Sequence, residues 1–298
     1  MLNFIYKWIE FVKKWHKNLK MWFFKITFTE KHHSVKKNQT ITAEYVDELE
    51  DKIVDLSIKL KNKEKVISDI QLANKKRIGQ ISHNLKNPVG VIYSFSEMML
   101  DNKGNFDSEK VKKYLQIIKN SASFSIELLN DIVEITRLND VDLKFNFTKE
   151  DCNKLLYDIV ESLQDNAKSK GVFIKINKQP ETFEALVDKD EFTLALTKVI
   201  ENAIRFSAEK GEIVIDVEEN LQNFEIKVTD TGLGISKDDL PKIFDEFYVV
   251  NTYDAEGEKC IGLGLSMVKK IIDEHNGKIL VKSTENVGSE FCVIIPKN

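Results

Sequence analysis

The chain has 298 residues, of which 42% are hydrophobic and 31% charged, and its formal net charge is -4. This length accommodates about two domains of ordinary size, and the composition excludes a disordered or membrane-embedded chain. The acidic balance beyond residue 40 argues against a general nucleic-acid-binding protein. Three widely separated cysteines have neither metal-ligand spacing nor a secretory context, so we expect reduced thiols in the cytoplasm at Cys152, Cys260 and Cys292.

Residues 1–28 are predicted to form a basic amphipathic helix. Trp8, Trp15 and Trp22 recur every seven residues on one stripe, and lysines supply the opposite side. Such a helix either lies on an anionic membrane surface or packs against protein, and both interpretations stay open. No uncharged apolar run approaches the ~20 residues of a membrane span. We therefore expect a cytoplasmic protein without a transmembrane span, peripheral at most to the inner face of the membrane.

Helical periodicity dominates the next part of the chain. Residues 29–43 are polar and predicted to be a linker, whereas apolar residues in 44–80 alternate at spacings of three and four, which predicts a coiled coil and hence a homodimer. The stripe continues through 81–139, where a polar turn at 101–107 separates two amphipathic segments, the second running from Ser108 to about Leu138. Doubling this helical hairpin in a dimer gives a four-helix bundle.

A second domain with a different pattern is predicted after a linker at residues 140–148. Between residues 149 and 298, five strand-like runs occur with helical segments at 151–170, 189–207 and 263–276, and eight of the 12 glycines lie between residues 211 and 288. This order predicts an α+β layered domain with its helices on one face of the sheet. The fold class is therefore a multidomain α and α+β protein.

The first hairpin helix carries a histidine and a proline close together. At 100° per residue, His83 lies about 200° from Ile81 and from Leu85, so its imidazole is predicted to face out of the bundle. Pro88 removes one backbone N–H and should bend the helix near His83 and Asn84. Taken alone, an exposed histidine on a helix is usually only part of the surface.

Two glycine pairs in the second domain suit a nucleotide site. In DTGLGI, Gly232 and Gly234 follow a strand that ends at Asp230, whose carboxylate suits an adenine amino group. The second pair opens a helix whose N-terminal N–H groups favour phosphate, and it lies in IGLGL, which comprises Gly262, Leu263, Gly264 and Leu265. Upstream, Asn202 and Arg205 share a helix face, where an amide oxygen suits Mg²⁺ and a guanidinium suits phosphate.

Five motifs in a fixed order resemble those of the sensor histidine kinases of two-component signalling. HNLKNP resembles the phosphoacceptor box of that family, ENAIRFS its asparagine box, DTGLGI its first glycine box, KIFDEFY its phenylalanine box and IGLGL its second glycine box. The similarity covers roughly residues 44–298. It implies that residues 81–139 form the dimerisation and histidine-phosphotransfer hairpin and that residues 149–298 form an α/β sandwich ATP-binding domain of the gyrase, chaperone and histidine kinase type.

The resemblance also implies a reaction and a set of site residues. ATP bound with Mg²⁺ would phosphorylate His83, and the phosphoryl group would pass to an aspartate in the receiver domain of a response regulator. Asn202 would be the metal ligand, and polar residues 251–259 would belong to a mobile lid. The nucleotide-binding residues that it implies are Asn202, Arg205, Asp230, Gly232, Gly234, Phe247, Gly262, Leu263, Gly264 and Leu265.

Departures from the family pattern leave several points open. Asn84 stands where the family commonly has an acidic base, and Asn87 matches the position that orients water for dephosphorylating the regulator, so the candidate catalytic set is His83, Asn84, Asn87 and Arg205. Lys198 replaces the first asparagine of its box and either contacts phosphate or is solvated. Cys260 replaces a glycine and is either a redox-sensitive thiol or an inert substitution.

Three other functions compete with an active kinase. The first is a protein that mainly dephosphorylates its regulator, as Asn84 and Asn87 together favour. The second is a non-catalytic dimeric scaffold that binds nucleotide as a structural ligand. A plain ATPase of the chaperone or repair kind is disfavoured because such proteins lack the histidine hairpin.

Overall fold

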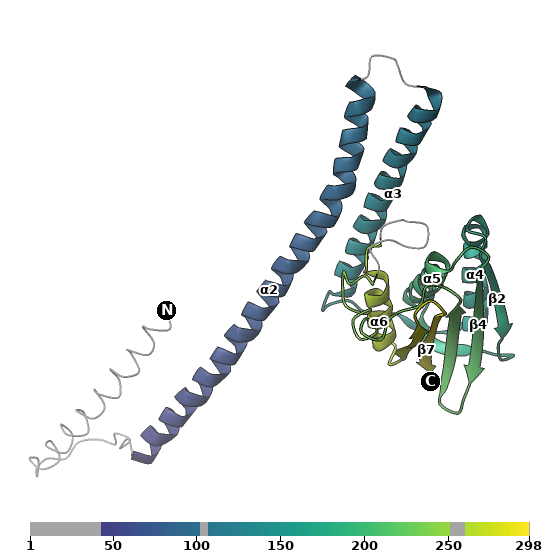
Figure 1. The fold of residues 1–298 in the computed structure, drawn as a ribbon. Helices are drawn as coiled ribbons and strands as arrows, with labels where there is room; N and C mark the ends of the chain where they lie inside the picture. The colour runs from purple at the N-terminus through teal and green to yellow at the C-terminus, as the bar shows by residue number, and fades with distance from the viewer. Residues whose placement is uncertain (1–42, 102–106, 251–259, 298) are drawn as a thin grey trace, which may run out of the picture. The chain divides into compact units, whose positions relative to one another are not determined.

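The structure, a computed structural model, describes residues 43–101, 107–250 and 260–297 (Figure 1). The predicted helix at 1–28, almost all of the linker at 29–43 and the lid segment at 251–259 lie outside the described residues. The chain divides into two compact units, one ending at Gln71 and the other beginning at Leu72. None of the described helices has an apolar stretch long enough to cross a membrane.

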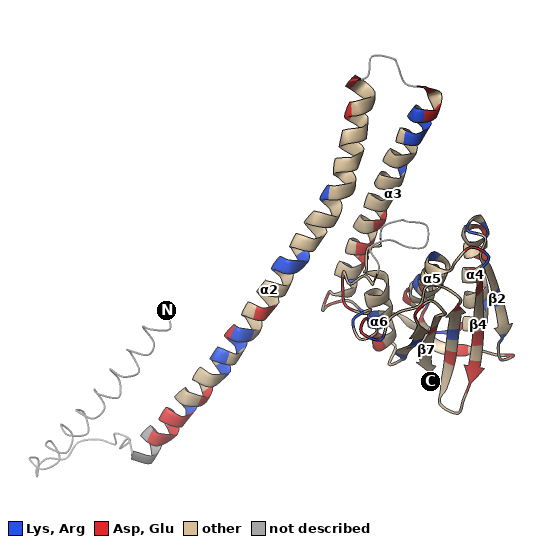
Figure 2. Cartoon of the chain, in the orientation of Figure 1, with Lys and Arg blue, Asp and Glu red and all other residues tan. Residues whose placement is uncertain are grey.

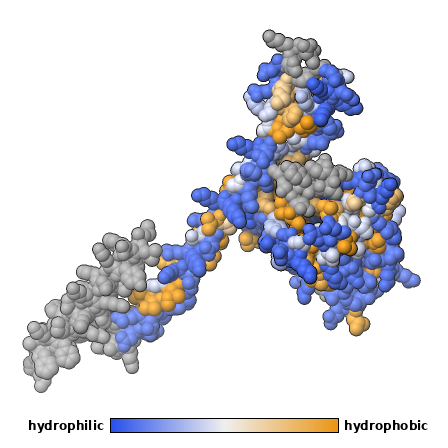
Figure 3. Space-filling view, in the orientation of Figure 1, coloured by the Kyte–Doolittle hydropathy of each residue, from blue (hydrophilic) through white to orange (hydrophobic). Residues whose placement is uncertain are grey.

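The first described element, α2 (Ala43–Asp101), is one continuous helix of 59 residues. Charged side chains of both signs follow one another along its first half (Figure 2), where Lys52 pairs with Glu48 and Lys59 with Asp55 one turn away. Between them the apolar stripe is exposed, as the orange patches on this helix show (Figure 3). The exposed residues at coiled-coil spacing are Leu49, Ile53, Leu56, Leu60, Ile67 and Ile70.

Helix α3 (Ser108–Leu138) has the limits that its periodicity predicts. It begins because the carboxylate of Asp107 accepts the N–H of Glu109 at 2.6 Å, which satisfies one of the donors left open in the first turn. Its buried residues include Leu128, Ile135 and Leu138, each at most 4% exposed, and its last turns contact α6. The end of this helix is therefore packed against the second domain.

The second domain is built on a five-stranded sheet covered on one face by three helices (Figure 1). Strand β2 pairs in parallel with β4, and all other neighbours are antiparallel. In spatial order the strands are β2 (Phe173–Lys178), β4 (Glu212–Glu219), β5 (Asn223–Asp230), β7 (Gly288–Pro296) and β6 (Lys278–Thr284). The covering helices are α4 (Cys152–Ser169), α5 (Lys189–Phe206) and α6 (Gly264–Glu274).

Alternation of side chains explains why one face of this sheet is buried. On β4 and β5, every second residue is buried, and the residues between them are more exposed. The inward set consists of Ile213, Ile215 and Val217 on β4 and of Phe224, Ile226 and Val228 on β5. Apolar faces of the helices close the core, and the predicted layered α+β class and its helices and main strands are confirmed.

A second, two-stranded sheet is absent from the predicted elements. Strand β1 (Phe147–Asp151) pairs antiparallel with β3 (Glu184–Asp188), so that Phe147 lies opposite Asp188. Both strands have only five residues, and the residues of β1 are exposed or half-buried, which removes the alternating pattern on which a prediction depends. The predicted linker at 140–148 therefore ends inside a strand.

The buried His275 fixes this small sheet against α6. Its Nε2 accepts the backbone N–H of Asp188 at 3.0 Å, so the proton of the neutral ring resides on Nδ1, which donates to the carbonyl of Ile271 at 2.7 Å. The rings of Phe145 and Phe147 contact the imidazole edge to face. Burial lowers the pKa of His275, which keeps the ring neutral.

Candidate functional site

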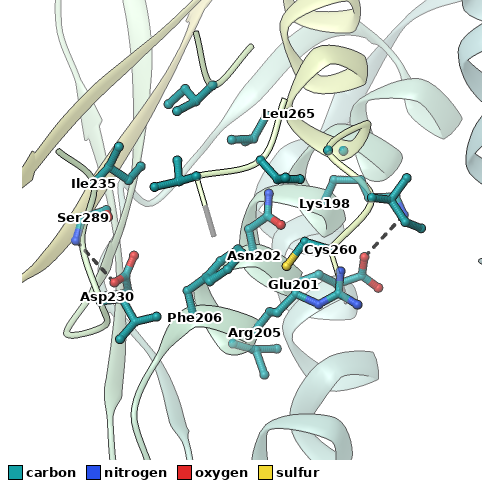
Figure 4. Close-up of a pocket in the computed structure, with 18 of the residues that line it drawn as sticks. Lys198, Glu201, Asn202, Arg205, Phe206, Asp230, Ile235, Cys260, Leu265 and Ser289 are labelled. Carbon is teal, nitrogen blue, oxygen red and sulfur yellow. Dashed lines mark hydrogen bonds and ion pairs between the residues drawn. The ribbon is translucent and has the colours of Figure 1, made fainter. Parts of the chain in front are cut away.

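A pocket of about 390 Å³ lies between α5, the C-terminal end of β5, the N-terminal end of β7, the start of α6 and one side of α3 (Figure 4). This volume lies in the range of small-molecule sites. Asp230 enters the pocket from the sheet, and Lys198, Glu201, Asn202 and Arg205 enter it from α5. The two glycine motifs contribute Gly234, Gly262, Gly264 and Leu265 to its wall.

Asp230 is positioned by the alternation of β5. Phe224, Ile226 and Val228 face the core, and Asp230 is the next residue of the same parity, so that its carboxylate is only 6% exposed. Its Oδ1 accepts the backbone N–H of Gly232 at 2.8 Å and that of Ser289 at 3.3 Å, and no described residue donates to Oδ2. A fixed, buried acceptor at a pocket wall suits an exocyclic amino group.

Burial also shifts the pKa of the Asp230 carboxylate. Desolvation raises the pKa of Asp230 above its ordinary value, and the N–H groups of Gly232 and Ser289 offset part of that rise. A ligand that donates a hydrogen bond to the ionised carboxylate would lower the pKa again. The site is therefore electrostatically suited to a neutral base with an amino donor.

The face of α5 that lines the pocket follows from helical spacing. Lys198, Asn202 and Arg205 are separated by four and three residues, which places them on one stripe. All three line the pocket, as expected for Asn202 and Arg205. An amide oxygen and a guanidinium on one stripe can serve a metal ion and a phosphate group, respectively.

Two carboxylates of α3 form a wall that sequence reasoning missed. Glu127 and Asp131 lie one helical turn apart and both line the pocket. Nη2 of Arg205 lies 3.4 Å from Oε1 of Glu127, and Nζ of Lys198 lies 3.1 Å from Oδ1 of Asp131. Their separation of about 70 residues from α5 in sequence leaves no local signal that would reveal these pairs.

Three glycines of the two glycine motifs lie where backbone segments of the protein approach each other closely. A Cβ at Gly232 would lie 2.3 Å from the carbonyl oxygen of Phe206, one at Gly234 would lie 2.0 Å from that of Thr284, and one at Gly262 would lie 2.5 Å from that of Tyr248. These positions need glycine because the protein's own backbone segments approach closely there. Contacts within the protein thus explain glycine at all three positions, and the interpretation that Gly232 and Gly234 make room for a nucleotide stays a prediction.

Gly264 is the glycine whose surroundings fit the bound group. It begins α6, and its Cβ would lie no closer than 3.8 Å to any atom, beside the side chains of Lys198 and Asn202. The N-cap residue Leu263 makes no side-chain hydrogen bond to the first turn, so within the described chain no side chain caps the N–H groups there. The arrangement fits a phosphate group next to Asn202 and Arg205.

Two predicted nucleotide-binding residues do not line the pocket in the described structure. Leu263 is completely buried, and Phe247 packs against the core without reaching the pocket wall in the described structure. The backbone of Phe247 has a φ of 61°, and its N–H donates to the carbonyl of Gly262 at 2.8 Å. Phe247 therefore links the phenylalanine box to the second glycine box through the backbone. Gly232, also buried, acts through its N–H to Asp230.

The predicted phosphoacceptor lies on α2. His83 is exposed, as its helical position predicts, Asn87 is also exposed, and Asn84 is half-buried. The helix continues through the buried Pro88. No group of three or more His, Cys, Asp or Glu side chains suited to a metal ion occurs in the described ranges.

Comparison with known families assigns the two parts of the chain. A family model described as "His Kinase A (phospho-acceptor) domain" matches residues 73–140, and one described as "Histidine kinase-, DNA gyrase B-, and HSP90-like ATPase" matches residues 187–298. The sheet, its helices and the pocket thus form an ATP-binding domain of this class. With the phosphoacceptor domain before it, the chain belongs to the sensor histidine kinases of two-component signalling.

Similar proteins agree with this assignment. The sensor protein SrrB of Staphylococcus aureus strain MRSA252 is 29% identical over 223 residues, which cover 74% of this chain and 37% of SrrB. The chain thus spans little more than a third of the length of that curated relative. A crystal structure of histidine kinase ThkA in complex with response regulator protein TrrA has 28% identity and a TM-score of 0.61, and the match covers 75% of this chain and 61% of that one. The Acinetobacter baumannii histidine kinase AdeS, with 22% identity and a TM-score of 0.56 over 72% of this chain and 98% of its own, shares the fold.

Proposed function

We propose that the chain phosphorylates itself on His83 with ATP and transfers the phosphoryl group to an aspartate in the receiver domain of a response regulator. The observation that carries the proposal is the pairing of two features in one chain. An exposed histidine lies within the phosphoacceptor domain, and a buried carboxylate, Asp230, lies in the pocket of the ATPase domain. The crystal structure of ThkA with TrrA supports a response regulator as the partner class.

Residues of this chain supply most of what phosphoryl transfer needs, which is positioning and charge stabilisation. Asp230 would accept the adenine amino group, and Arg205 and the N–H groups at the start of α6 would bind phosphate oxygens. Asn202 would hold Mg²⁺, which would neutralise charge on the phosphates. The imidazole of His83 would form the P–N bond as the bond to the leaving ADP oxygen breaks, and the ring would release its proton.

We also propose a homodimer. The apolar stripe of α2 between Leu49 and Ile70 is exposed along one helix, at the spacing that buries such residues in a two-stranded coiled coil. The phosphoacceptor hairpins of two chains would form a four-helix bundle. Peripheral binding to an anionic membrane through residues 1–28 remains a separate proposal, which co-sedimentation with anionic vesicles would test through its dependence on salt.

Radiolabelling tests the catalytic proposal. The full chain is incubated with Mg²⁺ and ATP labelled at the γ-phosphate, and we expect label that is stable in base and labile in acid. His83→Ala should abolish it while leaving ATP affinity unchanged. Because His83 is exposed and makes no hydrogen bond to a described residue, its replacement should not unfold the helix. Label that persists in His83→Ala would contradict the proposal.

A second candidate output is dephosphorylation of the regulator. It is favoured by Asn84, whose amide cannot remove a proton from the imidazole, and by Asn87, which is exposed one turn beyond His83. Removal of phosphate from a phosphorylated regulator, without labelling of the chain, would favour this function. ATP binding with neither activity would instead indicate a nucleotide-binding scaffold.

A further inference from the structure

Lys198 is a cation of the pocket wall to which the function proposed above assigns no role. It lies on the same stripe of α5 as Asn202 and Arg205, and its side chain is 19% exposed. Its Nζ lies 3.1 Å from Oδ1 of Asp131 on α3 and 3.7 Å from Oε2 of Glu201. Burial lowers the pKa of Lys198, but the carboxylates of Asp131, Glu201 and Glu127 together raise it further, so the net shift is upward and favours the ammonium form.

The stem of Lys198 passes beside the predicted phosphate position. A Cβ built on Gly264, the first residue of α6, would lie 3.8 Å from Cδ of Lys198 and 3.9 Å from Nδ2 of Asn202. Nζ is only two bonds beyond Cδ, and lysine side chains turn readily about these bonds. The ammonium group that now contacts Asp131 is therefore within reach of an anion at the start of α6.

The charges around Lys198 do not balance in the structure described. The pocket wall carries four carboxylates against three cations. The carboxylates are Glu127, Asp131, Glu201 and Asp230, and the cations are Lys170, Lys198 and Arg205. Asp131 is 6% exposed, and its burial raises its pKa although Lys198 opposes that rise. A polyphosphate that enters this pocket competes with the α3 carboxylates for Lys198 and Arg205.

We propose that Lys198 exchanges Asp131 for a phosphate oxygen of the bound nucleotide, so that ATP binding opens the ion pair between α5 and α3. The proposal rests on the nucleotide site proposed above and assigns it a second cation beside Arg205. Once its partner is withdrawn, Asp131 is an uncompensated buried carboxylate, which favours separation of α3 from α5 at this point. The ion pair thus competes with ATP and restrains the hairpin while the pocket holds no nucleotide.

Calorimetric titration of the full chain with ATP and Mg²⁺, and separately with adenosine, tests this exchange. Adenosine contains the base that Asp230 would bind but no phosphate. Lys198→Met keeps the stem and removes the charge, so we expect ATP affinity to fall about tenfold with adenosine affinity unchanged. Asp131→Asn keeps the shape and removes the competitor, so ATP affinity should rise about threefold to tenfold.

The double variant separates exchange from simple repulsion. If Asp131 acts by holding Lys198, Asp131→Asn should change ATP affinity less than about twofold in the Lys198→Met background. A gain as large as in the wild-type background would show direct repulsion of phosphate and would overturn the exchange. Glu191→Gln is the matched control, because Glu191 pairs with Arg137 of α3 at 2.5 and 2.8 Å outside the pocket, and this variant should leave ATP affinity unchanged.

The remaining outcomes are equally decisive. Wild-type ATP affinity in both single variants would overturn the exchange, and the proposed function would stand if Asp230→Asn still weakens ATP and adenosine. Loss of adenosine binding in Lys198→Met would show that Lys198 supports the pocket structurally, which also overturns the exchange. If the wild-type chain binds neither ATP nor adenosine, the proposed nucleotide site fails and the exchange fails with it.

Discussion

Asp230 and His83, the two residues on which the proposed function depends, differ in their exposure. Asp230 lies in a pocket whose walls belong to one chain, and backbone N–H groups fix its carboxylate. His83 lies exposed on a helix whose apolar stripe, further toward the N-terminus, is also exposed. The contrast teaches that the described wall of the proposed nucleotide site comes from this chain, whereas in the proposed dimer a second chain would cover the apolar stripe of the helix that carries His83.

The largest expected effect concerns the proposed dimer. Leu60→Asp places a charge on the exposed stripe of α2, and in a dimer two such charges would be buried together, so dimerisation should weaken about 100-fold or more. Asn62→Asp adds the same charge to the same helix at an outward coiled-coil position and should have little effect. Sedimentation equilibrium measures both, and equal dimer affinity in the two variants would contradict the coiled coil.

The next largest expected effect concerns Asp230 and nucleotide affinity. Asp230→Asn removes a buried charged acceptor, and affinity for ATP and for adenosine should fall about 10-fold to 100-fold while dimerisation stays unchanged. Isothermal titration calorimetry gives the affinities. Asp238→Asn, an exposed position in the segment after β5, serves as the control and should bind as the wild type does. Unaltered ATP binding by Asp230→Asn would place the nucleotide elsewhere.

A smaller effect concerns the base next to the phosphoacceptor. Asn84→Glu supplies a carboxylate able to accept the imidazole proton, so the rate of autophosphorylation should rise about tenfold or more. Asn84→Gln changes size without supplying a base and should stay slow. The initial rate of label incorporation from γ-labelled ATP is the measurement. Equal rates in the two variants would mean that proton removal does not limit the reaction.

The smallest effect is a pH dependence confined to the pocket. Because burial raises the pKa of Asp230, this carboxylate takes up a proton at a higher pH than an ordinary aspartate. A base amino group binds the ionised form, so adenosine affinity should be constant above the raised pKa and should fall as pH decreases through it. Titrations with adenosine avoid the protonation of phosphate, and an acid limb that persists in Asp230→Asn would assign the effect to another group.

Sequence alone predicted the parts of the fold that have strong periodicity. The limits of α3 and α5 follow from helical spacing, and β4 and β5 follow from strand-like runs, because each element buries one face. The helical segment predicted at 263–276 corresponds to α6, which is followed by the left-handed Asn276 with φ of 53°. The short strands β1 and β3 were missed because their stability comes from pairing with each other and from the contact of Phe147 with His275.

The residues of the site were likewise predicted where the signal is local in the sequence and missed where it is not. Asp230, Asn202 and Arg205 were predicted from local motifs, and the structure brings them to one pocket. Phe247 and Leu263 were assigned to the nucleotide from motif membership alone; neither lines the described pocket, and the assignment stays a prediction. Glu127 and Asp131 were missed because only tertiary packing of α3 places them beside α5, and the amphipathic pattern of α3 treats them as ordinary polar positions.

Helix α5 connects the contact with Arg137 of α3 to the pocket. Glu191 in its first turn receives the guanidinium of Arg137 in two hydrogen bonds, and Arg205 in its last turn lines the pocket. At 1.5 Å per residue these two points are about 21 Å apart along one axis. Because Arg205 also pairs with Glu127 of α3, the helix is held to the hairpin at both ends, and a change at the pocket end alone leaves the Arg137 contact in place as a fixed point.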